Sequence, residues 1–293
     1  MTAQPPTCQL CSQPGIPLHE DLRDRLFDAP GNWTLKRCTG CGFVWLDPMP
    51  RPDDLTLAYR NYYTHAADPD SPSLARRWYR QLLNLTPIGR ERQRLALMCL
   101  DQTPPGKLLD IGCGNGQRLV QFRDRGWDVE GQEIDERAVA VAREHFGLRI
   151  HAEPVEKLTG SYHAVILNHV IEHVPDPVGM LAQCHRLLCR DGQLVVITPN
   201  VAGYGHRKFG ASWRGLEPPR HLHLFTPATL QRAATLAGFA RLVVWTSSAR
   251  VVGLALGSQS SSRLCALWFQ LVAFVRSRLD PAVGEECVLQ AKK

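Results

Sequence analysis

The sequence predicts an α/β fold in which a doubly wound, mostly parallel sheet of seven strands follows a small cysteine-containing N-terminal domain. Two observations predict this arrangement. From Lys107 onward, short apolar strands alternate with amphipathic helices, as is typical of a parallel sheet that helices cover on both faces. Ahead of that region, two Cys-x-x-Cys pairs lie near the N-terminus. With 293 residues, the chain is long enough for one large and one small domain.

The elements of the large domain follow in a regular order. The expected strands are 107–111, 127–134, 148–152, 163–168, 193–198, 241–246 and 285–291. Helices are expected at 117–125, 135–146, 177–189 and 226–237, and the last of these opens with an N-cap Thr226 followed by Pro227. Upstream, 74–102 is helical in pattern with a break at Pro87, and its arginines form either a solvated face or a phosphate-binding strip.

The N-terminal cysteines have the spacing of a metal site. Cys8 and Cys11 form one knuckle, and Cys38 and Cys41 form the other, so that four thiolates can complete a tetrahedron around Zn²⁺. Four cysteine ligands leave no open coordination position, which predicts a structural site in a small N-terminal zinc-binding domain. The remaining cysteines are scattered singly in apolar surroundings and are expected to be core residues.

Composition and charge leave several classes open and exclude others. The chain is 44% hydrophobic and 21% charged, which is ordinary for a globular protein, and its net charge of +6 permits an anionic partner without demanding one. The N-terminus has no basic and apolar signal pattern, and the longest apolar run, 264–275, is too short to span a bilayer. Together with ten cysteines, these features favour a reducing, cytoplasmic location.

The stretch LLDIGCGNGQ (108–117) is a glycine-rich turn at the end of the first strand, where ligands of open α/β sheets bind. Its third glycine, Gly116, has the wrong register for a dinucleotide fingerprint, and no Gly-Lys-Ser/Thr follows to make a P-loop. Asp110 lies two positions before Gly112, and a carboxylate facing the ligand suits a cation better than a pyrophosphate.

This segment resembles the first motif of class I S-adenosylmethionine-dependent methyltransferases, and VEGQE and LNHVIEHVPDP follow in that family's order. The second of these resembles the small-molecule branch, which includes ubiquinone-biosynthesis methyltransferases. The resemblance covers roughly 105–245. It implies a Rossmann-like methyltransferase domain at 105–293 with an apolar helical insertion near 260–280. The zinc ribbon then occupies 1–50, and a helical linker and cofactor lid occupy 51–104.

The resemblance also implies a cofactor site. It gives the aminoacyl and sulfonium end of S-adenosylmethionine to Asp110 and the glycine turn, the ribose hydroxyls to Glu133, and the adenine to Val155. Asn168 and His169 fall beside the methionyl group, and Tyr63 could close over the cofactor or simply pack. The complete expected cofactor set is Asp110, Gly112, Cys113, Gly114, Gly116, Glu133, Ile134, Val155, Asn168, His169 and Tyr63.

The methyl acceptor must be aligned with the S–CH₃ axis and, if it is a hydroxyl or an acidic carbon, must lose a proton. Histidine is the usual base near neutral pH, and the RHLHLF stretch supplies His221 and His223. These two alternate along an extended chain, so one can face a cleft while the other packs elsewhere. Either is a candidate base, and a purely structural role for both is the alternative.

The expected function is methyl transfer to a small molecule, such as a sugar, lipid precursor or secondary metabolite, at oxygen or carbon. One alternative is an RNA methyltransferase that grips phosphate through the ribbon and arginines, although the Asn-His-Val-Ile at 168–171 differs from the Asn/Asp-Pro-Pro-Tyr of base-methylating enzymes. Another is a cofactor-binding adaptor without turnover. The expected partner is therefore a small-molecule acceptor rather than a nucleic acid. The apolar helix near 262–279 could cover substrate, join two subunits or rest on a membrane.

Overall fold

The computed structural model describes residues 7–60, 85–250 and 263–293, with the backbone alone for 263–267. Tyr63 and the predicted helical stretch 74–84 lie outside this described part. The chain divides into two compact units. One comprises Met1–Tyr62, His169–Ala182 and Ile197–Ala291, and the other comprises Tyr63–Asn168, Gln183–Val196 and Lys292–Lys293.

A seven-stranded sheet confirms the predicted α/β fold, with the strand order β10-β11-β8-β7-β4-β5-β6. Its strands are β4 (Lys107–Ile111), β5 (Asp128–Gln132), β6 (Arg149–His151), β7 (Tyr162–Asn168), β8 (Leu188–Pro199), β10 (Arg241–Ser247) and β11 (Glu286–Lys292). β4 runs parallel to β5 on one side and to β7 on the other, so the strand order reverses at β4. The turn after β4 therefore lies at a topological switch point, where open α/β sheets bind their ligands.

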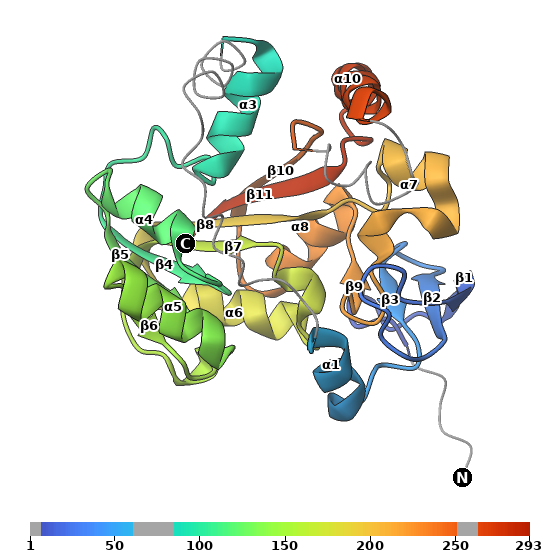
Figure 1. Cartoon of the computed structure of the whole chain (residues 1–293), viewed down its shortest axis with the longest axis horizontal. Helices are drawn as coiled ribbons and strands as arrows, with labels where there is room; N and C mark the ends of the chain where they lie inside the picture. The colour runs from blue at the N-terminus through green and yellow to red at the C-terminus, as the bar shows by residue number, and fades with distance from the viewer. Residues whose placement is uncertain (1–6, 61–84, 251–262) are drawn as a thin grey trace. The chain divides into compact units, whose positions relative to one another are not determined.

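The described helices are α1 (Pro52–Tyr59), α3 (Pro87–Ala96), α4 (Gln117–Arg123), α5 (Glu136–Phe146), α6 (Pro177–Leu187), α7 (Tyr204–Phe209), α8 (Pro227–Leu236) and α10 (Arg263–Leu279). Those expected to start at residues 117, 135, 177 and 226 begin within one residue of these positions, whereas the sequence did not predict α7. Asp135 caps α5 by accepting the N–H groups of Arg137 and Ala138, and Thr226 caps α8. Figure 1 shows α4 and α5 beside β4, β5 and β6.

Several boundaries differ from the prediction. The helical pattern expected over 74–102 ends at Ala96, the last residue of α3. The helix expected to run to Cys189 ends at Leu187, and β8 begins at Leu188 rather than at Gln193. Leu188 is buried, and burial within the sheet outweighs the local helical pattern of the sequence. Among the described residues, no helix has the length and apolar character needed to cross a bilayer.

The N-terminal region forms a second sheet of four strands. Its order is β1-β2-β3-β9, made of β1 (Gly15–Leu22), β2 (Trp33–Cys38), β3 (Val44–Leu46) and β9 (His223–Leu224). β9 comes from the RHLHLF stretch, far along the chain, and pairs Trp45 with His223. Figure 1 shows β9 next to β3, and half of the residues of β1 are exposed. Two segments expected in different domains thus share one sheet.

A buried ion pair connects three segments of the unit that contains the N-terminal residues. Arg220 is fully buried, and its guanidinium donates to both carboxylate oxygens of Asp24, at 2.7 and 2.9 Å. It also donates to the Ala58 carbonyl at 3.1 Å and to Glu217 at 3.2 Å. Burial disfavours the Asp24 carboxylate, but the bonds from Arg220 and from the Leu26 N–H outweigh burial and lower its pKa. The pair therefore joins the loop after β1, the helix α1 and the 217–221 turn.

Removing one partner of this pair is expected to cost about 3–5 kcal/mol of unfolding free energy, because Asp24→Asn removes the carboxylate that accepts two bonds from the buried Arg220 guanidinium and leaves Glu217 as its remaining acidic partner. Urea denaturation at neutral pH measures the loss. Asp28→Asn, an exposed neighbour, is the matched control and should stay within about 0.5 kcal/mol of wild type. Since the folded pKa of Asp24 is depressed, its contribution is complete above the unfolded value of about 4 and is lost as the pH falls further. Equal stability of the Asp24 and Asp28 variants would contradict this role.

Candidate functional site

The glycine turn between β4 and α4 is held in a left-handed backbone conformation. Gly112, Gly114 and Gly116 have φ angles of 65°, 55° and 80°. At Gly116 a side chain is also excluded by packing, because a Cβ would lie 2.4 Å from Leu148 Cδ1. Gly112 donates its N–H to the Gln132 carbonyl at 2.8 Å. The turn is thus fixed against the end of β5.

Asp110 is a buried carboxylate for which the described residues supply no hydrogen bond. Its side chain is fully buried, neither oxygen has a hydrogen-bond partner, and the nearest cation, Arg118 Nη1, is 3.6 Å away. Burial raises the pKa of Asp110 to about 6, Arg118 opposes that rise, and Glu133 adds to it. A buried acid without donors is costly unless a ligand completes it. Its chemistry fits the cationic, hydrogen-bond-donating end of an amino acid.

Glu133, by contrast, is held by three backbone N–H groups. Its Oε2 accepts from Gly114 at 2.9 Å, and its Oε1 accepts from Ile134 at 2.8 Å and from Asp135 at 3.0 Å. These bonds join the end of β5 to the glycine turn and fix the orientation of the carboxylate. Each oxygen of an ionised carboxylate can accept further bonds, so Glu133 keeps acceptor capacity for a ligand diol.

The other residues expected around the cofactor lie in differing environments. Cys113 is buried, and burial raises the pKa of its thiol, so it is a neutral packing residue. Ile134 is 73% exposed, whereas Val155 is buried in the short helix η1 (Val155–Lys157). Asn168 ends β7. With Asp110, the glycine turn and Glu133, these residues share one compact unit, and Tyr63 lies outside the described residues.

His169 belongs to the other unit and is held between two carboxylates. Its Nε2 lies 2.9 Å from Glu286 Oε1, and its Nδ1 lies 3.2 Å from Glu172 Oε1. Burial disfavours the imidazolium, but Glu172 and Glu286 outweigh burial and raise the pKa of His169 to about 9. The ring is therefore charged at neutral pH, and its backbone N–H is bonded to the Ile197 carbonyl.

Glu172, His173 and His221 form a second cluster in that unit, with ligand-capable atoms within 4.8 Å of one another. Glu172 and His173 lie in the short helix η2 (Ile171–His173), and Glu172 accepts from Thr198 Oγ1 at 2.9 Å. Such a set can exchange a proton or hold a cation. Sequence reasoning did not select Glu172, although its position between two histidines in HVIEHV was the available signal.

Backbone carbonyls set the tautomers of the two histidines in this cluster. His221 Nδ1 lies 2.8 Å from the Gly215 carbonyl, and His173 Nδ1 lies 3.0 Å from the Arg220 carbonyl. A carbonyl only accepts, so each Nδ1 carries the hydrogen and each Nε2 keeps a lone pair. His221 Nε2 lies 3.6 Å from Glu217 Oε2. Burial and the nearby His221 lower the pKa of His173 to about 4.

His223, the other candidate base, is fully buried and stacks on Phe43 at 5.3 Å. Its Nε2 lies 3.2 Å from the Pro175 carbonyl, and its Nδ1 is buried without a partner. Burial lowers its pKa to about 4. His223 thus lies within the four-stranded sheet, whereas His221 joins the cluster with Glu172 and His173.

The four N-terminal cysteines converge as their spacing predicts, with all four sulfurs within 4.8 Å of one another. Cys8 Sγ lies 3.5 Å from Cys41 Sγ, and Cys11 Sγ lies 3.3 Å from Cys38 Sγ. The N–H groups of Gly40 and Cys41 point at Cys38 Sγ. Burial works against the Cys38 thiolate, but these donors and the Cys11 thiol outweigh burial and lower its pKa to about 7.

Comparison with known proteins supports the interpretation of the glycine turn. Residues 62–243 match the family model described as "Methyltransferase domain". The chain is 32% identical over 175 residues to a ubiquinone biosynthesis O-methyltransferase of Pseudomonas aeruginosa, covering 55% of this chain and 75% of that protein. A homologue of the same name from Acinetobacter baumannii is 31% identical over 142 residues, which is 44% of this chain and 60% of that protein.

A solved structure shares the fold across most of the chain. The 1,6-didemethyltoxoflavin-N1-methyltransferase of Burkholderia thailandensis has a TM-score of 0.50 and 19% identity, and the match covers 89% of this chain and 95% of that one. The family match spans more than half of the chain and includes the β4 turn with Asp110 and Glu133. The chain therefore belongs to the methyltransferase-domain family and is an S-adenosylmethionine-dependent methyltransferase.

Proposed function

We propose that this enzyme methylates a small molecule at oxygen or carbon and that His221 is its base. The observation that carries the proposal is the tautomer of His221, whose Nδ1 hydrogen is held by the Gly215 carbonyl and whose Nε2 keeps a lone pair. The homologues named ubiquinone biosynthesis O-methyltransferase support a small acceptor and favour oxygen as the site. His221 is also buried, but His223 is the weaker candidate because it is part of strand β9 in the four-stranded sheet and is stacked on Phe43.

In this proposal, S-adenosylmethionine supplies an electrophilic methyl group to a nucleophile aligned with its S–C bond. Asp110 binds the cationic methionyl end, the backbone of the glycine turn approaches it, and Glu133 accepts the ribose hydroxyls. Val155 packs against the adenine. Asn168 borders the methionyl group, and His169 contributes through its backbone carbonyl because two carboxylates already hold its ring.

At the acceptor, His221 Nε2 takes the proton of a hydroxyl or an acidic carbon as that atom becomes nucleophilic. The resulting imidazolium is stabilised by Glu217, whose Oε2 lies 3.6 Å from Nε2. The Gly215 carbonyl keeps the ring from rotating. His221 thus accepts a proton at one nitrogen while the other nitrogen anchors the ring.

Asp110→Asn is expected to weaken S-adenosylmethionine binding by at least about ten-fold, because the neutral amide cannot pair with the cationic methionyl end. Wild-type affinity should also fall as the pH drops through about 6, where the raised pKa of Asp110 leaves the acid protonated. Isothermal titration calorimetry from pH 5 to 8 measures both effects. The Asn variant should lose that pH dependence, and unchanged affinity in the variant would place the cofactor elsewhere.

His221→Gln is expected to reduce kcat by about 10²–10⁴-fold, because the general base is lost while the fold is kept. The assay follows radiolabelled methyl transfer to hydroxylated aromatic, sugar and lipid-precursor acceptors, with cofactor affinity measured in parallel. His145→Gln, at an exposed histidine, is the matched control and should leave kcat unchanged. His223→Gln should lower Tm while leaving kcat close to that of wild type.

Two results would contradict this proposal. Wild-type kcat in the His221 variant would assign proton removal to another group. Transfer to structured RNA in preference to every small acceptor would replace the small-molecule function with the RNA alternative.

We further propose that the four-cysteine cluster binds one structural Zn²⁺. Tetrahedral Zn–S bonds of about 2.3 Å place the sulfurs about 3.8 Å apart, and the cluster approaches this spacing. The N–H groups that point at Cys38 Sγ stabilise a metal-bound thiolate.

Elemental analysis is expected to find about one zinc per chain, because four thiolates saturate a tetrahedral ion. Cys38→Ser should lose most of the metal and lower Tm, whereas Cys189→Ser, outside the cluster, should keep both. A wild-type preparation without zinc, purified with zinc in the medium and without chelators, would refute the site.

A further inference from the structure

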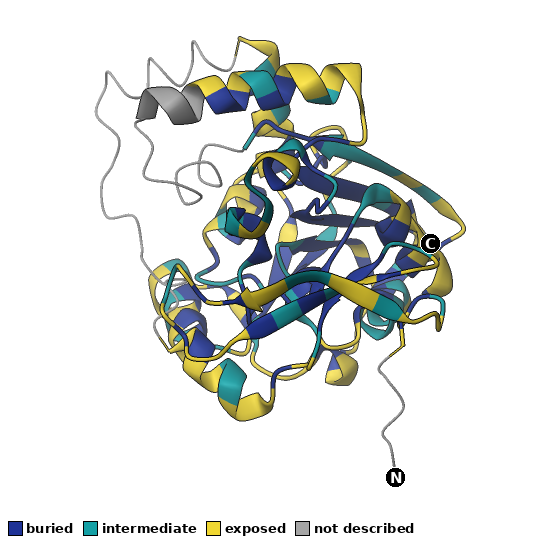
Figure 2. Cartoon of the chain, turned by 90° about the vertical axis from the view of Figure 1, so that its right-hand side faces the viewer, coloured by how far each residue is buried: buried dark blue, intermediate teal, exposed yellow. Residues whose placement is uncertain are grey.

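The helix α10 is apolar on two faces. Phe269, Ala273 and Phe274 are buried against the rest of their unit. A second stripe is exposed, with 68% of Trp268, 45% of Leu271, 49% of Val275 and 81% of Leu279 open to solvent. The spacing of these four residues keeps them along one side of a helix. Figure 2 shows the alternating buried and exposed bands along α10. A contiguous exposed stripe of large apolar residues marks an interaction surface rather than ordinary scattered exposure.

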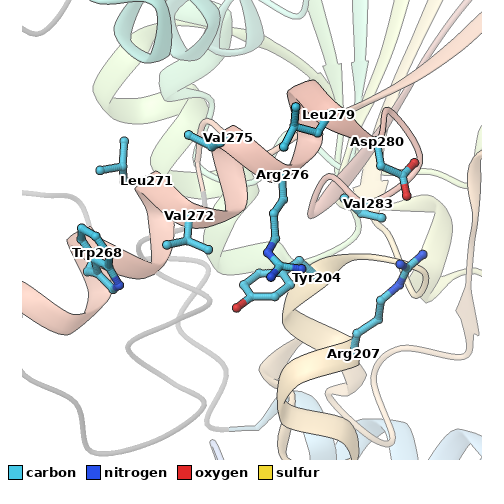
Figure 3. A pocket seen from close by; sticks show the side chains of 10 residues that line it. All are labelled: Tyr204, Arg207, Trp268, Leu271, Val272, Val275, Arg276, Leu279, Asp280 and Val283. Atoms are coloured by element: carbon cyan, nitrogen blue, oxygen red, sulfur yellow. The ribbon is translucent and has the colours of Figure 1, made fainter.

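All four stripe residues line an open groove, to which α7 also contributes Tyr204 and Arg207. Its volume is about 540 Å³, and its lining is largely apolar. In Figure 3, Val272 and Arg276 point from α10 toward Tyr204 of α7, and Val283 lies near the far end. Leu271, Val275 and Leu279 leave the helix on its other side in this view and also line the groove. The stripe and the groove therefore form one continuous apolar surface.

Positive charge surrounds this apolar surface. Arg276 lies over the Tyr204 ring at 4.6 Å, and Lys208 lies over the Phe209 and Phe269 rings at 5.4 and 5.3 Å. Arg207 lines the groove, and Arg278 lies over Phe274 at 4.8 Å. The sequence of α10 contains no acidic residue, and Asp280, just after it, is the one acid that lines the groove in the described part of the chain. The partner of this surface must therefore be both apolar and anionic.

We propose that α10 and the groove beside it dock on the surface of a bilayer that contains anionic phospholipids. The exposed stripe enters the boundary between headgroups and acyl chains, Trp268 lies at that boundary, and the arginines and Lys208 meet the lipid phosphates. In this proposal α10 lies in the plane of the membrane, with its exposed stripe toward the acyl chains. Charge argues against a second copy, because a two-fold interface would bring the same cationic surfaces together.

The test is vesicle flotation of the full-length protein. Wild type is expected to float with vesicles made of equal parts phosphatidylcholine and phosphatidylglycerol, and to bind vesicles of phosphatidylcholine alone at least about ten-fold more weakly. Added salt should weaken binding to the anionic vesicles. Trp268 fluorescence, obtained by subtracting the Trp268→Phe spectrum, should shift to shorter wavelength on binding.

Variants separate the apolar and the charged contributions. Leu271→Glu with Val275→Glu is expected to reduce binding at least about ten-fold, and Arg276→Gln with Arg278→Gln about five-fold for each arginine. The stripe residues are exposed, so folding should survive, as thermal unfolding would show. Leu236→Glu replaces an exposed leucine of another helix, 52% exposed on α8, and should leave binding unchanged.

Three outcomes would overturn the proposal. The first is wild type that binds neither kind of vesicle. The second is a stripe variant that binds anionic vesicles as tightly as the Leu236 control. The third is a wild-type dimer, seen by light scattering, that the stripe variant converts to a monomer while neither protein floats, because this result would make α10 a contact between two copies of the chain.

Discussion

The buried pair of Arg220 and Asp24 is the constraint on which the positions of His173 and His221 depend. The guanidinium bonds to Asp24 and Ala58 from the N-terminal region, while the Arg220 carbonyl accepts the His173 Nδ1 hydrogen. The next residue, His221, starts from a backbone fixed by its own N–H bond to the Glu217 carbonyl. A fully buried charge is stable only when it is paired, so the guanidinium holds Arg220 in one position. Because His173 is bonded to the Arg220 carbonyl and His221 is the next residue, both histidines are held in place with it.

The cofactor side shows how two carboxylates in one cradle acquire different roles. Glu133 accepts three backbone N–H groups, and these bonds make it part of the loop framework. Asp110 accepts none and is fully buried, so its ionised form is stabilised only weakly by Arg118. A ligand cation therefore gains more at Asp110 than at a carboxylate that already has its donors. Among the described residues, none donates a hydrogen bond to Asp110, which is the acid that we propose to bind the positively charged end of the ligand.

The fold could be predicted because its signals are local. Apolar runs of strand length, the caps at Asp135 and Thr226, and the register of the glycine turn each lie within a few residues of one another. The pairing of β9 with β3 could not, because it joins Trp45 to His223 across most of the chain. The alternation of RHLHLF predicts that the side chains of His221 and His223 have different surroundings. Only the pairing of β9 with β3 shows that His223 is the one within a sheet.

The histidine cluster requires the same long-range information, and its charges explain why three neighbouring imidazoles can coexist. Glu172 and Glu286 hold a proton on His169, while burial keeps His173 neutral, with its pKa lowered to about 4. The rings of His173 and His221 are packed edge to face, with their centroids 4.8 Å apart. When His221 takes up a proton, the neutral His173 ring therefore adds no second positive charge beside it. Glu217 then provides the compensating charge at 3.6 Å. In the proposed mechanism, a neutral His173 is thus the condition under which His221 can act as a base, and this condition is set mainly by burial, which no residue type in the sequence reveals.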